Sequence, residues 1–325
     1  MYADGYAGCE YRTAKITAAV ERFDDAINTA GGFAIGSDAA YAGGIVGTGA
    51  GRLSLIFPCV EKLYPGALPG PAQQRGDCTA HAQKNADLAS MCAEVVAGKP
   101  DDVTGLIEGA PDVPSAGVAN GVLSSEWPYW WRGYAGDGWQ CHLAAQASVT
   151  HGCMLRKRYS DALDLTQYSG KLAGRYGRKP PPDAFDAIGR QHIVRTATRV
   201  AGVDQLADFI HNGYAVTSCG SEGFSSVRDQ HGMSRKRGSW SHAMAYLGID
   251  CRPETVKHYG DKLVLLCNSW GNWNTGGRRI MGTEVDIPHG CFWARYSDIK
   301  RRSCIAMSSV DGWTPKELPD VFEGW

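Results

Sequence analysis

Three short segments, far apart in the chain, carry residue types that together can perform nucleophilic chemistry. Cys78 lies in the first segment, His242 in the second and Asn268 in the third. A thiolate is a strong nucleophile, but a free thiol is mostly protonated at neutral pH and needs a base to activate it. An imidazole can be that base, and an amide oxygen can fix the orientation of the ring. The three residues therefore predict a site at which a thiolate attacks an electrophilic carbon.

The residues around each of these side chains predict the element that positions it. Cys78 begins a run with helical periodicity, so its thiol should lie at a helix N-terminus, where the helix dipole favours the anion. His242 precedes an apolar run over residues 243–249, and Asn268 follows another over residues 263–267. Both runs are typical of buried strands. A strand would hold the imidazole rigidly against the thiol.

The three segments, in this order, resemble those of the papain-like cysteine peptidases. They are Gln73 to Ala82, Trp240 to Gly248 and Leu266 to Gly271. The resemblance implies that Cys78 is the nucleophile, that His242 transfers the proton and that Asn268 orients the imidazole. It also implies that Trp270, two residues after the asparagine, shields the hydrogen bond between histidine and asparagine from water.

In this family a glutamine before the cysteine supplies one donor of the oxyanion hole, and the cysteine supplies its own backbone N–H. Gln74 and Gln73 both qualify, but they stand four and five residues before Cys78, where the family usually has six. The loop is thus shorter, and the sequence leaves open which glutamine points inward. Thr79 is a second departure, because a tryptophan usually follows the nucleophile.

Other segments extend the resemblance to about residues 71–310. They are Gly121 to Tyr129, Val203 to Val216 and Gly290 to Tyr296. Substrate contacts are expected at Ser241, and at Gly117 in the nearest match to the glycine pair of the family. The resemblance implies an α+β fold with two lobes and the site in the cleft between them. The helical lobe should span about residues 72–165, and a lobe like a β-barrel about residues 193–307.

Two segments lie outside this peptidase-like domain (71–310). Residues 1–70 form an N-terminal extension, with a helix expected over residues 11–30, a Gly/Ala-rich arm over 31–51 and a strand over 53–60. Residues 311–325 form a C-terminal tail. The arm has too few large apolar residues to form its own core. We therefore expect the extension and the tail to contact the lobes or neighbouring subunits of a larger assembly.

Composition narrows the possible partners. The net charge is −1, so there is no electrostatic case for binding nucleic acid or an anionic membrane. No stretch approaches the ~18 consecutive apolar residues of a membrane helix. The first residues lack the basic and apolar regions of a signal peptide. These features favour an intracellular or virion-associated protein, and the resemblance implies that its substrate is a polypeptide.

The chain has 11 cysteines, and without an export signal we expect them to be mostly reduced. The alternative is one reactive cysteine together with some disulfides. Cys141, His142, His151 and Cys153 could in principle bind zinc, but adjacent Cys-His pairs rarely ligate one ion. We therefore expect no metal and no cofactor.

The sequence supports one function and leaves two alternatives. The expected function is hydrolysis of peptide bonds through a Cys-His-Asn triad. One alternative is a structural component of a viral particle that keeps this fold with little or no turnover, and the other is a cell-wall amidase. His81, one helical turn after Cys78, is expected to pack rather than to act as the base. The basic run over residues 235–237 predicts a solvated loop. The alternative is that these cations select acidic substrates.

Overall fold

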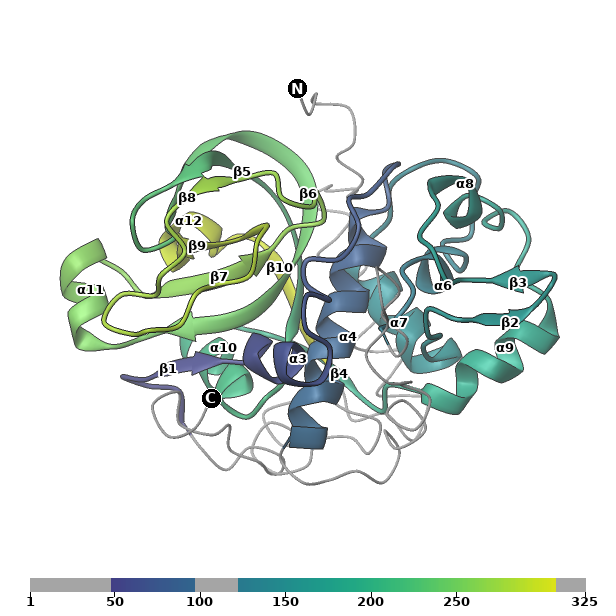
Figure 1. The fold of residues 1–325 in the computed structure, drawn as a ribbon, viewed down its shortest axis with the longest axis horizontal. Coiled ribbons are helices and arrows are strands. Elements are labelled where there is room, and N and C mark those ends of the chain that lie inside the picture. The colour runs from purple at the N-terminus through teal and green to yellow at the C-terminus, as the bar shows by residue number, and fades with distance from the viewer. Residues whose placement is uncertain (1–47, 97–121, 308–325) are drawn as a thin grey trace.

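Two lobes lie on either side of a long central helix, α4 (Cys78–Val96) (Figure 1). The structure, a computed structural model, describes residues 48–96 and 122–307. The predicted helix over residues 11–30, most of the Gly/Ala-rich arm, Gly117 and the tail over 311–325 lie outside the described residues. In the described residues, no helix is long and apolar enough to cross a membrane.

The helical lobe packs against one side of α4. Its other elements are α6 (Glu126–Tyr129), α7 (Cys141–His151), α8 (Gly170–Ala173), α9 (Asp183–Gly189), the 3₁₀ helix η1 (Arg190–His192), β2 (Arg158–Ser160) and β3 (Leu163–Asp164). Two tryptophans of the segment after residue 121, Trp127 and Trp130, are buried in its core with Met154 and Leu165. The aromatic residues of this segment are therefore packing residues, and α8 and α9 cover them.

The other lobe contains one sheet, which is antiparallel along the strand order β4-β10-β5-β6-β7-β9 and to which β8 adds a parallel pair with β5. The strands are β4 (Ala197–Arg199), β5 (Val216–Arg228), β6 (Ser234–Asp250), β7 (Leu263–Cys267), β8 (Thr275–Gly276), β9 (Cys291–Arg295) and β10 (Ser303–Met307), and the helices are α10 (Val203–His211), α11 (Pro253–Tyr259) and α12 (Tyr296–Ile299). The α+β fold agrees with the prediction from the sequence. The barrel-like closure does not, because the end strands β4 and β9 do not pair with each other.

The described part of the N-terminal extension is built into the core. β1 (Leu53–Leu55) pairs with β6, and α3 (Phe57–Leu63) packs against α4. The predicted strand over residues 53–60 is thus only half correct. Pro58 lies in the first turn of α3, where its fixed φ suits a helix and its missing N–H removes no hydrogen bond. The chain therefore turns into a helix where apolar composition alone suggested a strand.

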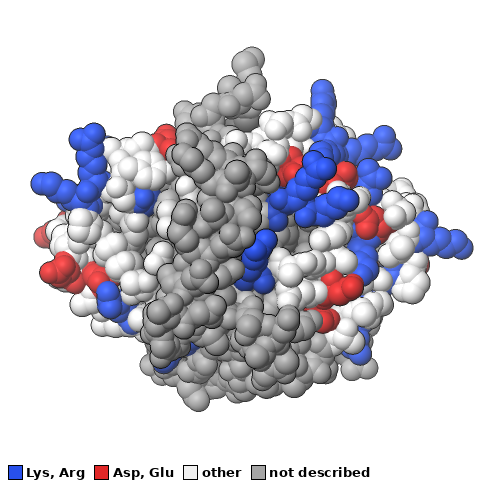
Figure 2. All heavy atoms as spheres, turned by 180° about the vertical axis from the view of Figure 1, so that it is seen from behind, with Lys and Arg blue, Asp and Glu red and all other residues white. Residues whose placement is uncertain are grey.

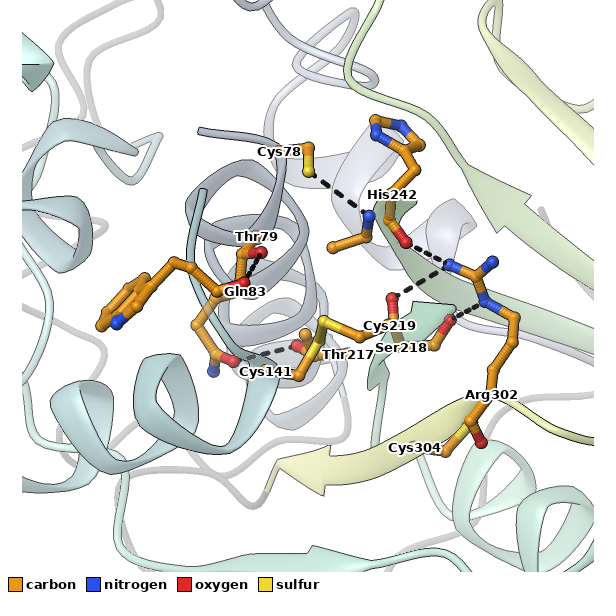
Figure 3. Close-up of a disulfide and its surroundings, with 12 residues drawn as sticks. Cys78, Thr79, Gln83, Cys141, Thr217, Ser218, Cys219, His242, Arg302 and Cys304 are labelled. Carbon is orange, nitrogen blue, oxygen red and sulfur yellow. Dashed lines mark hydrogen bonds between the residues drawn. A yellow bond between two sulfur atoms is a disulfide. The ribbon is translucent and has the colours of Figure 1, made fainter. Parts of the chain in front are cut away.

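One disulfide joins the two lobes. Cys141 of α7 is bonded to Cys219 of β5, next to α4 (Figure 3). Eight other cysteines in the described residues are free thiols, so most are reduced, as expected. The disulfide excludes Cys141 as a zinc ligand. No group of three or more His, Cys, Asp or Glu side chains within residues 48–96 and 122–307 could hold a metal ion.

The central helix buries polar side chains as well as apolar ones, because both lobes cover it. Lys84 is 1% exposed, and its ammonium group has no hydrogen-bond partner in the described part of the chain. Burial, assisted by the nearby Arg156, lowers the pKa of Lys84 to about 7. A buried ammonium without a partner destabilises the folded state at every pH at which it is protonated.

We expect Lys84→Met to raise the free energy of unfolding by on the order of 3–5 kcal/mol at pH 6. The pKa of Lys84 is lower in the folded state, so the folded state binds fewer protons between pH 7 and about 10.5. Stability of the unmodified protein therefore rises with pH across this window, and the gain from the substitution should shrink. Urea denaturation at pH 6 and pH 10 measures both effects. Lys171→Met, at an exposed lysine, is the control, and an equal gain at both pH values would refute the assignment.

Candidate active site

Cys78 occupies the position that the sequence predicts, at the N-terminus of α4. The helix begins at this residue, because the carbonyl of Asp77 accepts the first helical hydrogen bond from His81 N at 3.1 Å. The backbone N–H of Ala243 donates to Cys78 Sγ at 3.4 Å (Figure 3). The helix dipole and this donor each place partial positive charge near the sulfur. The thiol thus lies against the strand that carries His242.

His242 is buried in β6, and its ring is fixed by Asn268. His242 Nε2 donates to Asn268 Oδ1 at 2.7 Å. Because an amide oxygen can only accept, the ring proton lies on Nε2 and Nδ1 carries the lone pair. Nδ1 has no hydrogen-bond partner in the described residues, so it is the nitrogen that can take a proton. Burial lowers the pKa of His242 to about 3, so the resting imidazole is neutral at ordinary pH.

Asn268 immediately follows β7, one strand away from His242. The register pairs Ala245 of β6 with Cys267 of β7, which brings the end of β7 beside the histidine. Asn268 Oδ1 also accepts from Ser269 N at 2.7 Å, so the amide is held from two sides. Asn268 is fully buried, and its oxygen therefore orients the imidazole in a site from which water is excluded.

Aromatic rings pack on the ring of His242. The Trp270 ring lies 4.6 Å from the ring of His242, centroid to centroid, where the sequence predicts a shield. Trp240 adds a second ring at 6.2 Å from His242, and Trp273 packs on both tryptophans. Neither Trp240 nor Trp273 was predicted to contribute to the site. Trp240 had a usable signal, because residues two apart in a strand share a face.

The two glutamines are held on opposite sides of the loop that precedes α4. Gln73 accepts a hydrogen bond from the hydroxyl of Ser269, next to Asn268, and its side-chain amide donates to Arg75 O at 2.8 Å. Gln74 Oε1 accepts from Gly170 N of the helical lobe at 2.9 Å, and the residue is exposed. Gln73 is therefore the glutamine on the side of the histidine and the asparagine.

The loop is also fixed by a buried tyrosine and carboxylate. Tyr168 Oη accepts from Gln74 N at 2.9 Å and donates to Asp77 Oδ2 at 2.8 Å. His81 Nε2 lies 3.7 Å from the same carboxylate oxygen, and His81 is fully buried. His81 thus packs behind the loop. Thr79, where the family usually has a tryptophan, donates its hydroxyl proton to Trp139 O at 3.1 Å.

Arg302 is a residue near the site that the sequence analysis missed. It lies just before β10, and its guanidinium donates to His242 O at 2.6 Å (Figure 3). It also donates to Ser218 Oγ at 2.9 Å and to Glu222 Oε2 at 3.4 Å. These bonds link the backbone of His242 in β6 to two side chains of β5. The run Lys300-Arg301-Arg302 gives no local sign that one of its side chains points inward.

The two residues predicted to contact substrate, Ser241 and Gly117, are not placed beside the other site residues by the structure. Ser241 is exposed, as expected for a strand residue that faces away from the buried His242. Gly117 lies outside the described residues. Cys78, His242 and Asn268 are each 0% exposed. The histidine and the asparagine are hydrogen-bonded to each other, and the thiol contacts the backbone of Ala243, the residue after the histidine.

The comparisons with known proteins concern the fold. No family model matches the chain, and no curated protein matches its sequence. Xylellain, a cysteine protease from Xylella fastidiosa, aligns with a TM-score of 0.51 and 13% identity over 94% of this chain and 97% of that chain. The Amb a 11 cysteine protease of ragweed pollen, in its proform, reaches a TM-score of 0.47 and 16% identity over 94% and 76%. The structural similarity to xylellain shows that the chain has a papain-like α+β fold, and the low identity shows that its sequence has diverged far from that protease.

Proposed function

We propose that this protein is a cysteine peptidase that hydrolyses peptide bonds with Cys78, His242 and Asn268. The observation that carries the proposal is the hydrogen bond of 2.7 Å between His242 Nε2 and Asn268 Oδ1, which leaves Nδ1 as the basic nitrogen. The thiol meets the same strand through Ala243 N. A nucleophile at a helix start, a neutral imidazole and an amide that orients it are the parts that acyl transfer by a thiolate requires.

The reaction follows from these atoms. His242 Nδ1 takes the thiol proton as Cys78 Sγ attacks the carbonyl carbon of the substrate, and the carbonyl oxygen becomes an oxyanion. The imidazolium then gives its proton to the leaving amine, the C–N bond breaks and a thioester remains on Cys78. Water, deprotonated by His242, attacks the thioester and releases the acid together with the thiol. Asn268 stabilises the imidazolium in both halves of the cycle.

Covalent labelling tests the proposal on the intact protein. A peptidyl epoxide inhibitor should react with Cys78 and should leave the other thiols largely unmodified, because, among the free thiols of residues 48–96 and 122–307, Cys78 is the one that begins a helix and contacts the strand carrying His242. Peptide mapping by mass spectrometry locates the adduct, and His242→Ala should slow its formation. Slow labelling of Cys78 relative to the other cysteines would instead favour the alternative of a protein that keeps this fold without turnover. The complete burial of Cys78 is the observation that favours that alternative.

The oxyanion hole is proposed to consist of the backbone N–H of Cys78 and the side-chain amide of Gln73. Gln73 is anchored beside Asn268 through the hydroxyl of Ser269, on the side of the site where His242 and Asn268 lie. We expect Gln73→Ala to lower kcat by about 10²–10³-fold, the usual effect of losing one such donor. Gln74→Ala is the matched control and should stay within about threefold of wild type, because its oxygen is bonded to the helical lobe. Steady-state rates on a fluorogenic peptide compare the two, and the reverse order would exchange their roles.

A further inference from the structure

A basic hollow lies on the β lobe, outside the candidate active site. It is formed where the end of β5 and the start of β6 meet α11, and its volume is about 670 Å³. Arg235, Lys236 and Arg237 of β6 contribute to its lining, and His258 of α11 lies in the same wall. On the face drawn in Figure 2, Lys and Arg side chains project outward with Asp and Glu side chains among them. In the hollow, by contrast, the cations stand together.

The three cations of β6 are not neutralised by the protein. Arg235, Lys236 and Arg237 are exposed, and none of them has an ion-pair partner within the residues that the structure describes. Asp229 is the one carboxylate in the lining, and its oxygens are already used. Oδ2 accepts from Tyr259 Oη at 2.9 Å, and Oδ1 accepts from two backbone N–H groups.

The hollow also offers apolar surface next to the charges. Val227 is 62% exposed and lines the hollow, and Met233 is half-buried beside it. Arg228, in the wall, is 5% exposed and is fixed by donating to Cys291 O at 2.8 Å. A ligand that fits this surface carries carboxylates and apolar side chains together, as an acidic peptide does.

The position of the hollow relates it to the candidate active site. Lys236 and His242 lie on the same strand, β6, six residues apart. At the rise of a strand this corresponds to at most about 20 Å, a distance that an extended peptide of about six or seven residues spans. A peptide of this length is therefore long enough to extend from the position of His242 to that of Lys236.

We infer that the hollow binds an acidic segment of the polypeptide substrate, about six or seven residues from the bond that Cys78 cleaves. This inference rests on the proposed peptidase function. It assigns a substrate class that the Cys-His-Asn site alone does not specify. The formal net charge of −1 provides no general attraction for anions, so the selectivity would come from this local cluster.

Binding tests the inference independently of catalysis. The protein carrying Cys78→Ala is titrated into a fluorescent peptide of alternating Glu and Leu, and anisotropy reports the affinity. Arg235→Gln, Lys236→Gln and Arg237→Gln together should weaken binding about tenfold, and added salt should remove most of the difference. A peptide with Lys in place of Glu should bind neither the parent protein nor the triple variant more tightly than the Glu peptide binds the parent protein.

The control variant removes the same charge elsewhere. Lys171, Arg195 and Arg199 are exposed cations that do not line the hollow. Their joint replacement by Gln should leave the affinity within about twofold of the parent protein. Equal affinity of the parent and the hollow variant would overturn the inference, as would tighter binding of a single-stranded oligonucleotide through the same three residues.

A second arm uses the protein with Cys78 intact and peptides whose Glu block stands at increasing distance from one cleavable bond. The ratio kcat/KM should peak when the block is about six or seven residues away, and the hollow variant should lose the peak. A flat dependence on spacing would overturn the inference. If the acidic peptide binds but no peptide is cleaved, the peptidase proposal fails while the binding site stands.

Discussion

Replacing Cys78 with alanine should lower peptide hydrolysis by about 10⁴-fold or more, because no remaining atom can form the covalent intermediate. The substitution removes one sulfur atom from a buried position, so the protein should remain folded. The measurement is kcat/KM on a fluorogenic peptide, with circular dichroism to verify the fold.

Cys92→Ala is the matched control for this experiment. Cys92 lies in the same helix, is 2% exposed and is also a free thiol. Burial raises the pKa of Cys92 well above that of an ordinary thiol, so it is not a nucleophile. The control should therefore retain its activity and lose a similar amount of stability. Full activity of the Cys78→Ala protein would remove Cys78 from the mechanism.

Replacing Arg302 with methionine should lower the free energy of unfolding by about 3–5 kcal/mol, because it leaves a buried carboxylate without its partner. Glu222 is 8% exposed and pairs with Arg302 at 3.4 Å. The variant also loses the bond from the guanidinium to His242 O, so the position of the imidazole should shift and turnover should fall. Urea denaturation followed by circular dichroism measures the stability.

A double variant separates the two effects of this substitution. Glu222→Gln combined with Arg302→Met removes the unpaired charge and should recover much of the lost stability. It should not recover turnover, because the support of the His242 carbonyl is still missing. If the double variant is as unstable as Arg302→Met alone, the carboxylate is not the source of the loss.

The predictions that agree with the structure depend on local signals. The helix after Cys78 and the strands around His242 and Asn268 have apolar runs and flanking residues that predict each element from its own sequence. The order of the three segments, with cysteine before histidine and histidine before asparagine, then indicated that these elements belong to one papain-like fold. The start of α3 at Phe57 had a local signal too, Pro58, which outweighs the strand-like composition around it.

The features that the sequence could not predict depend on contacts between distant segments. The disulfide joins residues 78 positions apart, and neither cysteine has a neighbouring residue that predicts its partner. Arg302 belongs to a run of three basic residues, and only the packing of its segment against β5 and β6 buries one of them. The choice between Gln73 and Gln74 also depended on distant residues, Ser269 and Gly170.

The disulfide between Cys141 and Cys219 has a consequence for a chain that has been cut. Both lobes contribute one sulfur, so scission of the backbone at any bond between these cysteines leaves a single covalent molecule. Such a nicked protein would migrate as one band in a denaturing gel and would separate into two fragments only after a reducing agent is added. Gels run without a reductant would thus conceal self-cleavage at any of the 78 peptide bonds between the two cysteines.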